Sequence, residues 1–203
     1  DELDRDELDL LISVWTSTDR LAHMFWRYRD PKHPMYSEEG ARRYGGVLED
    51  TYQRMDAIVG KVRQRLREDD LLIVLSDHGF HSFRVGFNVN TWLIRNGYLA
   101  VKGAPDSETA FTETEFLQGF DWTKSRAYSL GLGSIYLNLR NREGNGIVNE
   151  ADAETLIEEL RAKLLEVVYP ETGENVFSHV YTRHDFGGKP TQDTPDLELG
   201  YAD

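Results

Sequence analysis

The sequence predicts an α/β fold with a parallel sheet and an inserted α+β part. Three observations support this prediction. The apolar run at 8–15 has the length and composition of a buried strand, residues 44–66 show helical spacing, and the apolar run at 71–76 reads as a second strand. A strand, a helix and a strand in this order are typical of a βαβ unit, whose two strands are parallel.

The segment between the two expected strands contains two helical parts. Residues 16–28 favour one or two helical turns, after which Pro31 and Pro34 require a loop. In the longer segment one face is apolar and the other is charged, which indicates an amphipathic helix. Its apolar positions are Tyr44, Leu48, Met55, Val59, Val62 and Leu66.

The second half of the chain has a different pattern of expected elements. A short helix near 88–96 ends at Asn96-Gly97 and leads into a strand, and the acidic stretch 104–115 predicts a loop. Asn149 is an expected N-cap for a helix over 150–168. The other expected strands are 125–130 and 134–139, which form a hairpin around Gly-Leu-Gly, and 174–183 and 196–201.

The order of the expected helices and strands predicts that the chain has three parts. Residues 1–83 form an α/β core segment, 84–185 an inserted α+β subdomain, and 186–203 a return to the core within one compact unit. The chain has 203 residues, 39% hydrophobic and 29% charged, which is enough for a soluble domain with a core.

Charge and composition limit the partners. The net charge of -13 argues against nucleic-acid or anionic membrane partners, because phosphate backbones require a basic face. It does not argue against a small phosphoester substrate, since bound cations can reverse the local field. The chain has no cysteines, which excludes thiolate metal sites and leans toward the cytoplasm without deciding the compartment. No apolar run approaches ~18 residues, and no signal peptide is visible.

Two pairs of polar residues carry the candidate chemistry. Asp19 and His23 are spaced to lie on one face of a helix, and Asp77 and His78 end the strand at 71–76. Each pair follows the carboxyl end of an expected parallel strand, the sheet edge where ligands bind. Carboxylate and imidazole together suit Zn²⁺, Mn²⁺ or Fe. The alternative is a non-catalytic α/β module with structural Asp-His pairs, in which His23 and His78 would lie apart or form core hydrogen bonds.

Other polar residues favour less specific roles. Thr18 and Ser76 lack a paired base and are expected to support neighbouring ligands. Arg84, Asn88 and Asn90 are candidates for substrate contacts, although Asn90 also suits a helix cap. Four histidines are expected outside the site: His33, His81 and His184 in loops and His179 in a core hydrogen bond.

The segments LISVWTSTDRLAHMFWRY and LLIVLSDHGF together resemble the alkaline phosphatase superfamily, and within it the type I phosphodiesterase/nucleotide pyrophosphatase-like proteins. The resemblance continues through NVNTWLIRNGYL, SIYLNLRNREGNGIV and TPDLELGY, so that it covers nearly the whole chain. TDRLAH followed by SDHGF is its specific part.

The resemblance implies an alkaline phosphatase-like core and a site with two divalent ions, Zn²⁺ first and Mn²⁺ or Fe as alternatives. Asp19 and His23 match the pair on the metal that activates the attacking water. Asp77 and His78 match ligands of the second metal, which lowers the pKa of a Thr or Ser nucleophile. That hydroxyl attacks phosphorus to form a phospho-enzyme, which water then hydrolyses.

The chain also departs from the family pattern. The upstream Asp ligand, the Thr or Ser nucleophile and a downstream His have no counterpart here. We therefore expect an internal piece of a longer enzyme, inactive by itself and weak in metal affinity. The expected full-length activity is hydrolysis of a phosphodiester or phosphomonoester, nucleotides included. A phosphomutase or a sulfatase of the same superfamily is the alternative, and the sequence does not indicate an oligomeric state.

Overall fold

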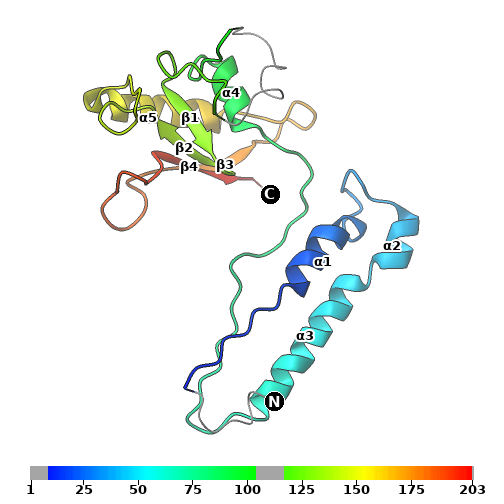
Figure 1. Cartoon of the computed structure of the whole chain (residues 1–203). Helices are drawn as coiled ribbons and strands as arrows, with labels where there is room; N and C mark the ends of the chain where they lie inside the picture. The colour runs from blue at the N-terminus through cyan, green and yellow to red at the C-terminus, as the bar shows by residue number, and fades with distance from the viewer. Residues whose placement is uncertain (1–8, 104–116, 203) are drawn as a thin grey trace. The chain divides into compact units, whose positions relative to one another are not determined.

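The computed structural model describes residues 9–103 and 117–202. The chain divides into two compact units, Asp1–Gly86 and Phe87–Asp203 (Figure 1). The expected acidic loop at 104–115 lies outside the described residues. In the part of the chain that is described, no helix is both long and apolar enough to cross a membrane.

The first unit is helical. Its elements are α1 (Ser17–Phe25), the short 3-10 helix η2 (Trp26–Tyr28), α2 (Glu38–Tyr44) and α3 (Val47–Arg63). α1 and η2 confirm the predicted helical turns, and α3 confirms most of the predicted amphipathic helix. α2 was not predicted, and Tyr44 belongs to its end, because the chain turns at residues 45–46 before α3 begins. α1 packs against α3, and the buried side chains of the two helices are Ala22, Leu48 and Thr51.

Local contacts explain where these helices begin and how they hold together. Ser37 is the N-cap of α2, because its hydroxyl accepts a hydrogen bond from the Gly40 backbone N–H at 3.1 Å. Tyr44 at the end of α2 packs against Phe25, with ring centroids 5.4 Å apart. The first unit therefore depends on aromatic contacts more than on a large aliphatic core.

The parallel sheet expected in the first unit is not found in the described residues. Residues 9–15 and 71–76 run without strand pairing, and residue 8 of the first expected strand lies outside the description. Their apolar side chains face solvent, with Ile12 exposed by 75% and Leu75 by 81%. The pattern predicted strands because it is apolar and β-prone, but a strand also requires a hydrogen-bonded neighbour. Neither run has one here.

The second unit is built on a four-stranded antiparallel sheet (Figure 1). Its strands are β1 (Ala127–Leu130), β2 (Ser134–Leu137), β3 (Phe177–Thr182) and β4 (Leu197–Tyr201), in the order β1-β2-β4-β3. The predicted hairpin is confirmed as β1 and β2, and Gly131 in its turn has a φ of 70°, which favours glycine. Because β4 lies between β2 and β3, residues 197–201 complete this sheet.

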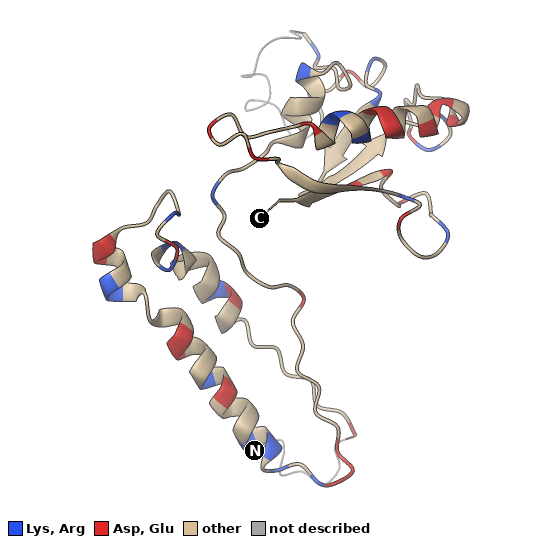
Figure 2. Cartoon of the chain, turned by 180° about the vertical axis from the view of Figure 1, so that it is seen from behind, with Lys and Arg blue, Asp and Glu red and all other residues tan. Residues whose placement is uncertain are grey.

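The helix α5 (Glu150–Leu165) supplies much of the second unit's core and packs against β3. Its buried residues are Ala153, Leu156, Ile157, Leu160 and Leu164. Each buried leucine or isoleucine side chain of this set contributes about 1.5–3 kcal/mol relative to an exposed one. The predicted helix extended to residue 168, but α5 ends at Leu165 and Val168 is 45% exposed. Acidic and basic residues alternate along α3, whereas the acidic residues of α5 precede its basic ones (Figure 2).

The short helix α4 (Val89–Arg95) is tied to β1 by a buried amide. Asn88, not Asn90, is its N-cap, since the Asn88 side chain accepts a hydrogen bond from the Thr91 N–H at 2.9 Å. The Asn90 side chain is buried, donates to the Ser129 carbonyl at 2.9 Å and accepts from the Ser129 N–H at 2.8 Å. The strand expected after Gly97 is reduced to one isolated bridge between Val101 and Phe120.

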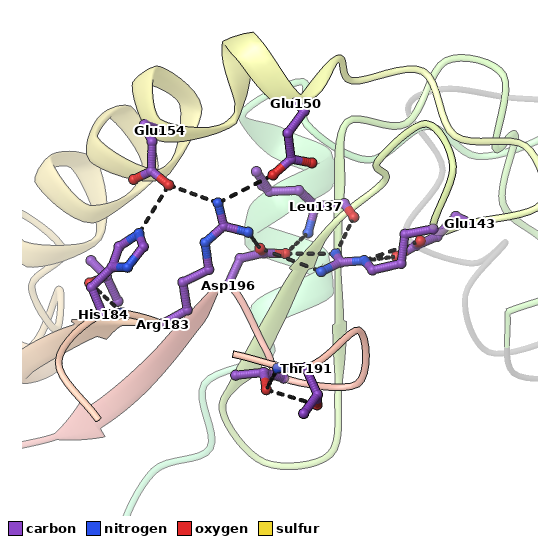
Figure 3. A network of polar contacts seen from close by, with 11 residues as sticks. Leu137, Glu143, Glu150, Glu154, Arg183, His184, Thr191 and Asp196 are labelled. Atoms are coloured by element: carbon purple, nitrogen blue, oxygen red, sulfur yellow. Dashed lines mark hydrogen bonds and ion pairs between the residues drawn. The ribbon is translucent and has the colours of Figure 1, made fainter. Parts of the chain in front are cut away.

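A buried carboxylate joins the strands to two arginines (Figure 3). Asp196 is fully buried and accepts hydrogen bonds from Arg142 and from the Leu137 N–H, each at 2.7 Å. Arg183 approaches the other carboxylate oxygen at 3.4 Å and also donates to Glu154 on α5 at 2.7 Å. The carboxylate is thus paired and hydrogen-bonded, the condition for burying a charge.

Candidate metal centre

The helix α1 places the first predicted pair on one face. Asp19 lies in the first turn and His23 in the last, and the His23 Nε2 is 3.4 Å from the Asp19 Oδ1. The helix dipole favours a negative group near the N-terminus and a positive one near the C-terminus. Both side chains are accessible to solvent, Asp19 at 45% and His23 at 65%.

The second predicted pair lies against the first. The His78 Nε2 is 3.7 Å from the Asp19 Oδ1 and 3.7 Å from the Asp77 Oδ2. The side chains therefore form a continuous run of contacts in the order His23, Asp19, His78, Asp77. One oxygen of Asp19 lies within 4 Å of an imidazole from each pair.

The backbone beside His78 determines which ring nitrogen carries the proton. The His78 Nδ1 lies 2.8 Å from the Gly79 carbonyl oxygen, which can only accept a hydrogen bond, so Nδ1–H is the donor. In the neutral ring the Nε2 atom then carries the lone pair, and it lies 3.7 Å from the Asp19 Oδ1. The pKa of His78 is raised, first by this hydrogen bond and then by the charges of Asp77 and Asp19, which outweigh desolvation.

An ion pair holds the segment after His78 near the end of α1. Arg84 donates from Nη2 and Nε to one oxygen of Asp30, at 3.0 and 3.2 Å. Hydrogen bonds from the Ser82 side chain and the Lys32 backbone, with a smaller contribution from Arg84, lower the pKa of Asp30 to about 2. Arg84, which the sequence offered for substrate contact, is therefore engaged with the protein itself.

One aromatic residue at the site was missed by sequence reasoning. The Phe80 ring contacts the imidazoles of His23 and His78 and the indole of Trp26, with centroids 4.8, 5.6 and 5.7 Å away. The available signal was its place directly after Asp-His-Gly. Only the fold shows that its ring packs on α1.

The remaining histidines lie away from this run of contacts. His33 accepts a hydrogen bond from the Met35 N–H within its loop, and His81 is exposed. His184 pairs with Glu154 at 3.0 Å. His179 was expected to complete a core hydrogen bond, but it is exposed and stacks on Tyr181 with ring centroids 5.6 Å apart.

The predicted residues meet as pairs and not around one point. Within residues 9–103 and 117–202, no group of three or more His, Cys, Asp or Glu side chains is arranged to hold one metal ion. Each pair offers one carboxylate and one imidazole, which is a donor set that suits Zn²⁺.

Comparison with known proteins identifies the family. The family model described as type I phosphodiesterase / nucleotide pyrophosphatase matches residues 1–199. The chain belongs to this family. The match includes both Asp-His pairs, the strands β1 to β3 and the first three residues of β4, and it supports a phosphoester hydrolase in general terms. No curated protein and no solved structure gives a significant match.

Proposed function

We propose that the two Asp-His pairs are parts of a two-metal phosphoester hydrolase site. Asp19 and His23 would hold one divalent ion, and Asp77 and His78 a second. The observation that carries this proposal is the contact of His78 with Asp19, which joins two pairs far apart in the sequence. Family membership adds the reaction class, cleavage of a phosphodiester or pyrophosphate bond.

The donor chemistry fits divalent zinc. A neutral imidazole binds metal through one nitrogen while the other donates a hydrogen bond that fixes the ring. His78 meets this condition through its Gly79 contact. Zn²⁺ accepts mixed nitrogen and oxygen ligands, and Mn²⁺ and Fe are the alternatives for this donor set.

The protein's own contribution is to hold negative charge where cations would bind. Asp19 and Asp77 flank the His78 ring, so that the site is anionic without bound ions. Bound ions would lower the pKa of an oxygen nucleophile and stabilise charge on the phosphoryl group. Their charge also explains how a chain of net charge -13 would accept a phosphoester, nucleotides included.

The test is a calorimetric titration of the chain with Zn²⁺ and with Mn²⁺. The variant Asp77→Ala/His78→Ala should lose the zinc ion assigned to this pair, so that it binds fewer zinc ions than the wild type. A matched control, Asp193→Ala/His179→Ala, removes the same residue types from exposed positions in the second unit and should bind as the wild type does. Circular dichroism verifies the fold of each variant. Absence of saturable binding to the folded wild type, or equal binding by both double variants, would refute the proposal.

A further inference from the structure

We infer that Phe80 is a positioning residue that fixes the orientation of both imidazoles, His23 and His78. The inference rests on the proposed metal function of these pairs. It goes further by assigning a role to an apolar side chain that is neither a ligand nor part of the large core.

The first part of the argument is the burial of Phe80. Along residues 73–81 the other side chains are exposed, whereas the Phe80 ring is half-buried. Phe83, a neighbouring residue of the same type, is 77% exposed. The segment that carries Asp77 and His78 is therefore anchored near these ligands by the Phe80 ring.

The second part is the surface that receives the ring. His23 and Trp26 are three residues apart at the end of α1, so that they project from neighbouring positions on one face. The Phe80 ring meets the His23 imidazole edge to face, at an interplanar angle of 82°, and lies tilted by 30° to the Trp26 indole. Edge-to-face geometry is a preferred arrangement of aromatic rings, so this contact favours one orientation of His23.

The third part is the contact with His78. The same Phe80 ring lies 5.6 Å from the His78 imidazole, at an interplanar angle of 58°. His78 is then held by its Nδ1 hydrogen bond to Gly79 on one side and by the Phe80 ring on another. Because one ring touches a ligand of each pair, its loss should disturb both at once.

The consequence is a dependence of metal affinity on a residue that does not touch the metal. A flexible imidazole must lose rotational freedom when it binds an ion, whereas a ring that is already packed loses less. Loss of groups that orient metal ligands lowers affinity by about 10–100-fold. For the loss of Phe80 we expect the lower end of this range, an affinity about 10-fold weaker, since the ring acts by packing and makes no hydrogen bond.

The experiment compares Phe80→Leu, Phe80→Tyr and the control Phe83→Leu in the full chain. Zinc affinity is measured by calorimetry, and the ring signals of His23 and His78 are recorded by NMR on the metal-free protein. Phe80→Leu should weaken zinc binding about 10-fold and shift both sets of ring signals. Phe80→Tyr, which keeps the aromatic ring, and Phe83→Leu should both bind as the wild type does.

The outcomes separate this inference from the proposed function. Zinc binding by the wild type with equal affinity in Phe80→Leu would overturn the positioning role and leave the metal site standing. Unchanged His23 and His78 ring signals in Phe80→Leu would overturn it as well. A wild type without saturable zinc binding would overturn both. If Phe80→Leu does not fold, the test relies on Phe80→Tyr, which keeps the aromatic ring. Weakened zinc binding in folded Phe80→Tyr would contradict a positioning role that depends on the ring.

Discussion

Replacing the buried carboxylate of the second unit, Asp196→Ala, should strongly destabilise that unit. Asp196 is fully buried and compensates two arginines, Arg142 and Arg183, whose side chains are only 14% and 15% exposed. It also accepts a hydrogen bond from the Leu137 N–H on β2. The alanine variant removes the anion, and both cations and the backbone donor stay in place.

The expected loss of unfolding free energy depends on which ion pairs the two arginines keep in the variant. Removing one partner of a buried ion pair costs about 3–5 kcal/mol, because the other charge is left uncompensated. Arg142 retains Glu143 at 2.9 Å, and Arg183 retains Glu154 at 2.7 Å. These contacts offset part of the cost, so we expect about 3 kcal/mol. With an m-value of about 1.5 kcal/mol/M in urea, the unfolding midpoint should fall by about 2 M.

The assay is urea unfolding followed by the fluorescence of Trp92 and Trp122, in a background where Trp15 and Trp26 are Phe. The signal then reports only the second unit. Asp193→Ala removes an exposed carboxylate three residues away and serves as the control, with an expected change within about 0.5 kcal/mol. A loss below about 1 kcal/mol in Asp196→Ala would refute the reasoning, because that is the range of exposed ion pairs.

Three further predictions concern other parts of the structure. Gly146→Ala would place a Cβ against the Leu139 carbonyl and should destabilise the second unit by more than about 2 kcal/mol in the same urea assay, whereas Gly144→Ala has open space and should change little. Asn90→Ala leaves the buried Ser129 N–H and carbonyl unpaired and should cost about 1–3 kcal/mol, measured likewise. The pKa of Asp30 is lowered from 3.8 to about 2. The ionised carboxylate therefore contributes fully to the stability of the first unit above pH 3.8, and this contribution is lost as the pH falls through 2. The acid-dependent loss of stability should be absent in Asp30→Asn. The measurement is unfolding of the first unit as a function of pH, followed by the fluorescence of Trp26.

Several elements of this fold could be predicted from the sequence alone. Three elements depend only on spacing within a short segment. They are the amphipathic helix α3, the leucine face of α5 and the Gly-Leu-Gly hairpin. The i, i+4 placement of Asp19 and His23 has the same origin, because the helix itself brings them together. Local periodicity therefore determined these helices and the Asp19–His23 pair.

Long-range contacts were decided only by the tertiary structure. The apolar runs at 9–15 and 71–76 predicted paired strands, yet an apolar pattern carries no information about which neighbour supplies the hydrogen bonds. The same holds for the burial of Asp196 between two arginines and for Phe80 between two imidazoles. The contacts of Asp196 with Arg142 and of Phe80 with His23 join segments far apart in the chain. Sequence determined which side chains were available, and packing decided which of them met, because burial and pairing are properties of the whole fold.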